Sequence, residues 1–187
     1  MKEIEVKARA RDFKKLMNSL REMGCKFSEP IYQNDRIFLD KNIKFSDIKK
    51  DTNIMRIRDS NGIFILTLKI HLENELDCIE REIIVNDSKQ AEDILFYLGF
   101  REVIRVKKKR IKIKYKDLEI CLDEVEGLGN FIEIEKIIKE GDSLKIQEEL
   151  FKFLESLGVK REDKVFQGYD SLIYNLNLLS KQNSEKK

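Results

Sequence analysis

Three stretches of this chain alternate carboxylates with apolar residues: KEIEVKA at residues 2–8, CIEREI at 78–83 and FIEIEK at 131–136. Successive side chains of a strand point to opposite faces, so this alternation places the carboxylates on one face and the apolar groups on the other. Basic residues alternate in the same way along residues 103–115. The chain must therefore form a sheet that buries one face of nearly every strand and accommodates charge on the other.

The same patterns locate the secondary structure. Alternation and β-branched content predict strands at residues 2–9, 32–40, 53–59, 63–71, 78–86, 103–115, 118–124 and 130–139. Apolar residues at helical spacing predict helices at residues 11–23, 88–98, 142–156 and 163–178. The Asn61-Gly62 pair between two strands predicts a tight hairpin turn. The polar, lysine-rich segment 40–53 has no strong element, and we expect a mobile loop or lid there.

The ionic strand faces allow two architectures. In an open antiparallel sheet they would face water, which is the common arrangement. Two features favour a closed sheet. The predicted helices carry apolar stripes that need the apolar sheet faces as partners, and the ionic faces carry both signs of charge at more positions than edge protection requires. We therefore predict an α+β fold in which a closed barrel has helices outside and charged side chains inside. The single domain is expected to span residues 1–178, followed by a disordered tail at 179–187.

Composition excludes several functional classes. The 37 basic and 35 acidic residues nearly cancel, so global charge gives no attraction to nucleic acid or membranes. No apolar run approaches the roughly 18 residues of a membrane span, and charges begin at Lys2, which argues against a signal peptide. We expect no nucleic-acid partner, no membrane association and a cytoplasmic location. The three cysteines are scattered and flanked by apolar residues, as is typical of buried reduced thiols.

Other motifs are missing or weak. The single histidine, His71, makes a His-based zinc site or a Ser–His triad hard to build, and its place at a strand end predicts a surface position. No P-loop or dinucleotide-binding glycine pattern occurs in the sequence. The basic run 107–116 could form an exposed ribbon for RNA, but Ile111 and Ile113 interrupt it and no RNA-reading signature with stacking aromatics is present. That interpretation is less favoured than a charged interior.

A charged interior requires partners, because buried ions are costly unless they are paired or bound to a ligand. A mixed lining of Arg, Lys, Asp and Glu matches a polyphosphate with its divalent cations. Guanidinium and ammonium groups bind phosphate oxygens, and carboxylates bind Mg²⁺ or Mn²⁺. Phosphoryl transfer requires mainly positioning and charge stabilisation from the protein. We therefore interpret the repeated Glu-x-Glu pairs as metal ligands.

At these residues the chain resembles a known family. EIEVK, with Glu3, Glu5 and Lys7, resembles the N-terminal Glu-x-Glu-x-Lys signature of the CYTH superfamily, the triphosphate tunnel metalloenzymes. Further resemblances follow in chain order: QNDRIF (33–38), MRIR (55–58), LTLK (66–69), EREI (80–83), KKR (108–110), ICLDEVEGLGNFIEIE (120–135) and QGYDSLI (167–173). The stretch at 120–135 is similar to the class IV adenylate cyclase branch, and the last stretch is similar to the family's C-terminal helix. A series of ordered matches is far more specific than one motif alone.

The resemblance implies a closed eight-stranded antiparallel tunnel that binds a triphosphate and Mg²⁺ or Mn²⁺. Carried over by motif, the metal ligands and catalytic carboxylates would be Glu3, Glu5, Asp123, Glu133 and Glu135. The substrate-binding cations would be Lys7, Arg56, Arg58, Lys69, Lys108 and Arg110. Glu80 and Glu82 match further acidic tunnel positions, which either bind metal or orient the basic neighbours.

The resemblance also implies the activity. We expect a divalent-metal-dependent enzyme that acts on a triphosphate-bearing small molecule, ATP or polyphosphate, in the manner of a class IV adenylate cyclase, which converts ATP to cyclic AMP and pyrophosphate. The shared core equally permits hydrolysis of tripolyphosphate, thiamine triphosphate or a nucleoside triphosphate. A polyphosphate- or nucleotide-binding module without turnover is the remaining alternative, although phosphate binding alone does not require so many carboxylates. The final helix could also serve a homodimer.

Overall fold

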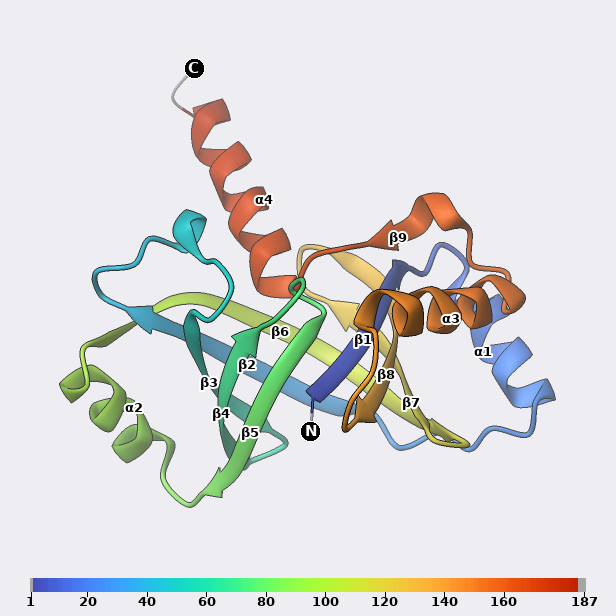
Figure 1. Ribbon diagram of the computed structural model, residues 1–187, viewed down its shortest axis with the longest axis horizontal. Helices are drawn as coiled ribbons and strands as arrows, with labels where there is room; N and C mark the ends of the chain where they lie inside the picture. Colours follow the sequence, from blue (N-terminus) through green and yellow to red (C-terminus); the bar gives the residue numbers. More distant parts are fainter. Residues whose placement is uncertain (1, 185–187) are drawn as a thin grey trace.

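The computed structural model describes residues 2–184, and its strands close into an antiparallel barrel (Figure 1). The strands are β1 Lys2–Arg9, β2 Ile31–Asp40, β3 Asn53–Ser60, β4 Ile63–His71, β5 Asp77–Val85, β6 Phe100–Tyr115, β7 Leu118–Val125, β8 Gly129–Ile138 and the short β9 Lys164–Val165. They lie in the order β5-β4-β3-β2-β6-β7-β8-β1-β9, and a further pairing of β5 with β1 closes the eight long strands. The predicted closed eight-stranded fold is therefore confirmed.

The seam that closes the barrel is short. β1 pairs with β8 along its whole length, from Lys2–Ile138 to Arg9–Phe131, but with β5 only at Glu3–Cys78 and Ile4–Asp77. A side chain from outside the sheet reinforces this seam. The Gln147 amide nitrogen donates to the carbonyl of Glu5 on β1 at 3.0 Å and to that of Leu76, just before β5, at 3.3 Å.

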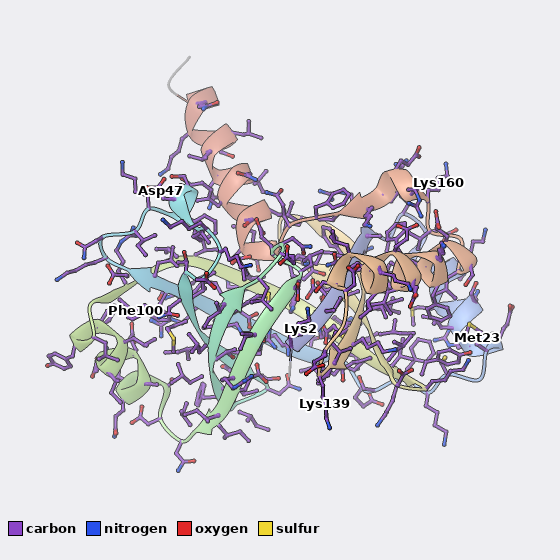
Figure 2. All side chains as sticks on the ribbon, viewed as in Figure 1. Lys2, Met23, Asp47, Phe100, Lys139 and Lys160 are labelled. Atoms are coloured by element: carbon purple, nitrogen blue, oxygen red, sulfur yellow. The ribbon has the colours of Figure 1, made fainter. Side chains whose placement is uncertain are left out.

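Four helices lie outside the barrel: α1 Phe13–Glu22, α2 Ser88–Tyr97, α3 Ser143–Ser156 and α4 Tyr169–Ser184. Asp12, Asp87 and Asp142 cap the first three, since each side chain accepts hydrogen bonds from backbone N–H groups of the first turn. In Figure 1, α1 and α3 flank one half of the barrel, α2 flanks the other half, and α4 projects from the middle. Met23, after α1, and Phe100, at the start of β6, lie toward opposite ends of the long axis (Figure 2).

The expected separation of apolar and ionic strand faces is present. Ile4 and Val6 of β1 and Ile132 and Ile134 of β8 are at most 1% exposed and belong to a core cluster that includes residues of α1 and α3. Residues between them in the sequence point to the opposite face and line the interior. The Asn61-Gly62 turn is also as expected, with φ of 51° and 86°, the left-handed values that such a hairpin requires. Among the described helices, none is both long and apolar enough to cross a membrane.

Two expectations for the last helix need correction, and the loop that contacts this helix gains some detail. The predicted helix at 163–178 begins later, at Tyr169, because Arg161–Asp163 form a 3₁₀ turn and β9 pairs with β1. It also continues to Ser184, so residues 179–184 are helical; residues 185–187 lie outside the described part of the chain. The loop at 40–53 contains a 3₁₀ turn, Phe45–Asp47, and Phe45 stacks on Tyr174 of α4 at 4.5 Å between ring centroids.

The prediction that His71 lies at the surface is wrong. His71 ends β4 but is only 9% exposed. It pairs with Cys78 on β5 at the barrel seam, and the charge of Asp170 on α4 also acts on it. Burial, and then Lys69, lowers its pKa to about 4. Cys78 and Cys121 are buried free thiols, as expected, whereas Cys25 is half-buried.

Candidate active site

A cavity of about 570 Å³ occupies the interior of the barrel. It is lined by every predicted site residue except Asp123, which lies behind the lining and bonds to Arg110. The cavity has two unlike ends. At the deep end, Lys7, Asp123 and Glu133 are at most 2% exposed. At the open end, the side chains of Lys112 and Glu119 are 40% and 41% exposed. A ligand can therefore reach the interior from the Lys112–Glu119 end.

Three carboxylates meet between these ends. Oxygen atoms of Glu3, Glu5 and Glu135 lie within 4.8 Å of one another, and we call this trio the acidic cluster. The geometry of the cluster follows from the register of β1 on β8. Glu5 lies directly opposite Glu135 in this ladder, and Glu3 lies two residues before Glu5 on the same face of β1. Like charges directly opposite in a sheet repel each other. A positively charged partner is needed to offset the repulsion among these three carboxylates.

The pKa values show this repulsion. Burial, and then the charges of Glu135 and Glu80, raise the pKa of Glu3 to about 8. Burial also raises the pKa of Glu135 to about 7, with Glu133 and Glu5 adding to the effect against the opposing pull of Arg110. A divalent cation would relieve this repulsion. Three carboxylates are a hard, all-oxygen donor set of the kind that Mg²⁺ and Mn²⁺ prefer, so the residues fit the metal that the sequence implied.

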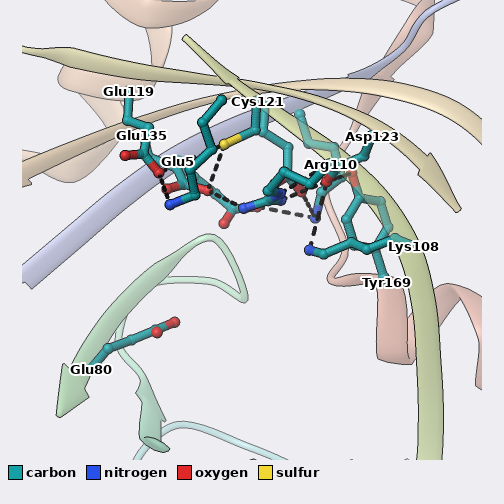
Figure 3. A network of polar contacts seen from close by, with 12 residues as sticks. Glu5, Glu80, Lys108, Arg110, Glu119, Cys121, Asp123, Glu135 and Tyr169 are labelled. Atoms are coloured by element: carbon teal, nitrogen blue, oxygen red, sulfur yellow. Dashed lines mark hydrogen bonds and ion pairs between the residues drawn. The ribbon is translucent and has the colours of Figure 1, made fainter. Parts of the chain in front are cut away.

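A thiol adjoins the acidic cluster. Sγ of Cys121 lies 3.8 Å from carboxylate oxygens of both Glu119 and Glu135, and the three residues offer ligand atoms within 4.8 Å of one another. Lys112 donates to Glu119 at 2.5 Å. Figure 3 shows this group beside Glu5 and the cations, with Glu80 on the opposite side of the cavity.

At the deep end, carboxylates are paired with cations. Arg110 donates to Asp123 at 2.7 Å through Nε and also bonds to Glu133. Lys7 Nζ lies 3.1 Å from Glu133 and 3.0 Å from Glu5. Burial opposes ionisation of Glu133, but Lys7 and Arg110 outweigh it and hold its pKa well below the usual range. This carboxylate therefore has its countercharges within the protein.

The wall formed by β2 to β5 is also paired. Arg58 donates to both oxygens of Asp35, each at 2.7 Å. Glu80 lies between Lys69, at 3.2 Å, and Arg56, at 3.3 Å. Although burial opposes it, these two cations lower the pKa of Glu80 to about 2. Glu82, nearer solvent, accepts from Arg56 at 2.9 Å. Both glutamates thus fix the positions of cations in this structure.

The structure therefore divides the predicted carboxylates. It brings Glu3, Glu5 and Glu135 together, whereas Asp123 and Glu133 are paired directly with cations. Lys7 and Arg110 link the two groups, because Lys7 also bonds to Glu5 and Arg110 also bonds to Glu135. The predicted cations all line the cavity: Lys7, Arg56, Arg58, Lys69, Lys108 and Arg110.

Sequence reasoning missed two residues of the site. Asp35 is 4% exposed and accepts hydrogen bonds from Arg58. The sequence feature that could have identified it is the QNDRIF motif, in which it shares a strand face with Gln33. Tyr169 lines the deep end and donates its hydroxyl to Asp123 at 2.9 Å. In the sequence, only the resemblance of QGYDSLI to the family pattern pointed to Tyr169. Hydrophobic periodicity cannot show that the first residue of an outer helix directs its side chain into the barrel.

Comparison with known proteins agrees with this geometry. The family model described as the CYTH domain matches residues 1–169. The chain belongs to the CYTH family. A curated relative from Methanocaldococcus jannaschii, named "Putative adenylate cyclase MJ0240", is 32% identical over 174 residues, which cover 90% of this chain and 97% of the relative.

Solved structures of similar proteins share the fold. The PH1819 protein of Pyrococcus horikoshii is 34% identical, with a TM-score of 0.76 and coverage of 92% of this chain and 99% of that chain. HpAC1 from Hippeastrum is 17% identical, with a TM-score of 0.58 and coverage of 89% and 90%. HpAC1 is described as an adenylyl cyclase candidate with a dominant triphosphatase activity. At that identity the likeness to this CYTH protein concerns the fold alone.

Proposed function

We propose that this CYTH protein is a divalent-metal-dependent enzyme that converts ATP to cyclic AMP and pyrophosphate, as in class IV adenylate cyclases. One observation carries the proposal: a single cavity contains the acidic cluster, in which the pKa values of Glu3 and Glu135 are raised, beside a wall of buried, oriented cations. The relative named for adenylate cyclase activity supports the choice of reaction.

The two groups of residues have different roles in this proposal. Glu3, Glu5 and Glu135 would hold Mg²⁺ or Mn²⁺, which supplies charge neutralisation at the reacting phosphoryl group. Lys7, Lys108 and Arg58 would bind the far phosphates by charge-assisted hydrogen bonds. Asp35 and Glu80 hold Arg58, Arg56 and Lys69 in place before substrate arrives. That preorganisation lowers the cost of aligning a highly charged substrate.

The arrangement orients ATP along the cavity. With the terminal phosphate at the deep end, the α-phosphorus lies toward the acidic cluster and the ribose toward the open end. The ribose 3′-oxygen then bonds to the α-phosphorus as the α–β bridging bond breaks, and pyrophosphate leaves with that bond's electron pair. The proton of the hydroxyl is released to solvent water through the open end.

Hydrolysis of a triphosphate is the second candidate, and the open end favours it. The described residues lining that end are mostly charged, with Leu118 and Ile137 as the apolar members. Such a lining provides little apolar surface for a nucleobase. A hydrolase acting on inorganic tripolyphosphate or thiamine triphosphate would need no adenine site, and water would take the place of the ribose hydroxyl.

A product assay distinguishes these activities. Purified protein is incubated with ATP or tripolyphosphate and Mg²⁺ or Mn²⁺, and cyclic AMP, pyrophosphate and orthophosphate are measured separately. Cyclic AMP together with pyrophosphate supports the cyclase. Orthophosphate without cyclic AMP supports the hydrolase and overturns the cyclase proposal. Tight binding without any product under either metal would support a binding module and overturn both enzymatic proposals.

A further inference from the structure

We infer that Tyr169 forms the floor of a blind tunnel and thereby sets how deep a polyphosphate chain can enter, which makes it a specificity-determining residue. The inference rests on the proposed function in one respect, that the cavity binds a phosphate chain. Gly168, Tyr169 and Asp170 line the cavity at the start of α4. Tyr169 is only 6% exposed, although it begins a helix that projects from the barrel (Figure 1).

The Tyr169 ring lies against the deep cations. Nζ of Lys7 is 4.2 Å and Nζ of Lys108 is 4.9 Å from the ring centroid. The hydroxyl donates to Asp123 at 2.9 Å, and the ring packs edge-on against Phe131 with centroids 5.1 Å apart. A phosphate that reaches Lys7 and Lys108 therefore meets an aromatic wall immediately beyond them.

The backbone around this floor is fastened from several directions. The N–H of Gly168 donates to Glu75, in the loop between β4 and β5, at 2.8 Å. Lys7 donates to the carbonyl of Gln167 at 3.2 Å. Leu172 and Ile173 of α4 pack against a core cluster that includes Tyr169. A floor held by side chain, backbone and helix packing does not yield easily to a longer chain.

A fixed floor places the phosphate chain at a fixed register relative to the acidic cluster. Glu5 lies 3.0 Å from Lys7 Nζ, and Glu3 lies two residues further along the same face of β1, so a phosphate chain that ends at Lys7 runs directly past the acidic cluster. Each added phosphoryl group extends the chain further along Glu5, Glu135 and Glu3. Without metal, these carboxylates repel it. The wild-type protein should therefore prefer tripolyphosphate to tetrapolyphosphate, and the preference should depend on the floor.

The test measures binding rather than turnover. Dissociation constants for tripolyphosphate and tetrapolyphosphate are determined by calorimetry in EDTA, where metal-dependent turnover is absent. Tyr169→Ala removes the floor, so the ratio of the two constants should shift by about tenfold toward tetrapolyphosphate. Tyr169→Phe keeps the ring and should retain the wild-type ratio within about threefold. Asn177→Ala, at an exposed position of the same helix outside the cavity lining and outside that core cluster, is the matched control and should retain it too.

Each outcome has one meaning. An unchanged ratio in folded Tyr169→Ala overturns the inference and leaves the proposed function standing. If the wild-type protein binds tripolyphosphate neither in EDTA nor with Mg²⁺, the proposed function itself is overturned. If Tyr169→Ala does not fold, the wild-type protein supplies the test through ATP and diadenosine triphosphate, which has no free terminal phosphate. A blind tunnel requires the capped compound to bind at least about tenfold more weakly; equal binding overturns the inference.

Discussion

Glu133 and Glu135 point into the same cavity from the same face of β8, two positions apart, yet their chemistry is opposite. Both are largely removed from water. Lys7 and Arg110 outweigh the effect of burial at Glu133 and lower its pKa, whereas burial and neighbouring glutamates raise that of Glu135 to about 7. The difference lies in the partners and not in the strand. Glu133 has both Lys7 and Arg110 as countercharges. Glu135 shares Arg110, at 3.1 Å, and lies opposite Glu5, so this one shared cation does not offset burial and the repulsion from neighbouring glutamates.

This comparison indicates that the two regions of the tunnel have different roles. The deep end is electrostatically complete within the protein and is suited to holding phosphates in place. The acidic cluster is incomplete without a cation and is suited to holding metal at the reacting phosphoryl group. Variants that remove a single carboxylate from either region should therefore have different consequences.

The largest expected effect is on turnover. Glu135→Gln removes one negative oxygen from the acidic cluster, and metal-dependent product formation should fall by about a thousandfold, of the order seen when a preorganised electrostatic contact is lost. Its melting temperature without metal should be at least that of wild type, because like-charge repulsion is relieved. Steady-state kinetics and thermal unfolding measure the two quantities. Glu124→Gln, on an exposed residue of β7, is the control. Wild-type turnover in Glu135→Gln would contradict the metal-ligand role.

The neighbouring substitution should act mainly on stability. Glu133→Gln leaves the ammonium of Lys7 and the guanidinium of Arg110 buried with less countercharge. Breaking a buried pair on one side costs about 3 kcal/mol of unfolding free energy. Urea unfolding at neutral pH checks this, with Glu135→Gln as the paired comparison. Equal stability of the two variants would show that the two carboxylates do not differ in the way proposed.

Much of this arrangement could be predicted from the sequence, because strand alternation determines faces. Period-2 patterning fixed which side chains of β1, β6 and β8 point inward, and the helical stripes required the outward faces as partners. Which carboxylate pairs with which cation could not be predicted, because this depends on the register between strands that are distant in sequence. Glu133 was expected to bind metal but pairs with Lys7, because the β1–β8 ladder places these residues directly opposite.

The C-terminal region was predicted least well, for a related reason. His71 has no neighbour in the sequence that indicates burial; it is buried at the barrel seam, opposite Cys78 on β5, and the charge of Asp170 at the start of α4 acts on it. Tyr169 reaches the cavity only because β9 pairs with β1 and brings the following residues over the deep end. Such contacts arise from closure of the barrel, which leaves no periodic signal in the chain.

The smallest expected effect concerns pH and tests the acidic cluster without a change in the deep end. The pKa values of Glu3 and Glu135 are raised in the folded state to about 8 and about 7, whereas in the unfolded chain both lie near the ordinary value. At pH values between the ordinary glutamate pKa and these raised values, the folded protein retains protons on Glu3 and Glu135 that the unfolded chain has lost. Stability of the metal-free protein should therefore be highest near pH 5 and fall as pH rises to 8.

Divalent metal should reverse this trend, since it displaces the retained protons. Mg²⁺ or Mn²⁺ should bind more tightly as pH rises from 6 to 8, with proton release detectable as a buffer-dependent heat of binding. The measurement is urea unfolding from pH 5 to 8.5, in EDTA and in saturating metal. The double variant Glu3→Gln/Glu135→Gln should lose the fall in stability above about pH 6.5, because neither position can then titrate; below that pH the lowered pKa of His71 contributes a rise of its own. A fall in stability that persists in this variant would assign the titration to groups outside the acidic cluster, and the contrast between Glu133 and Glu135 would then have no role in metal binding.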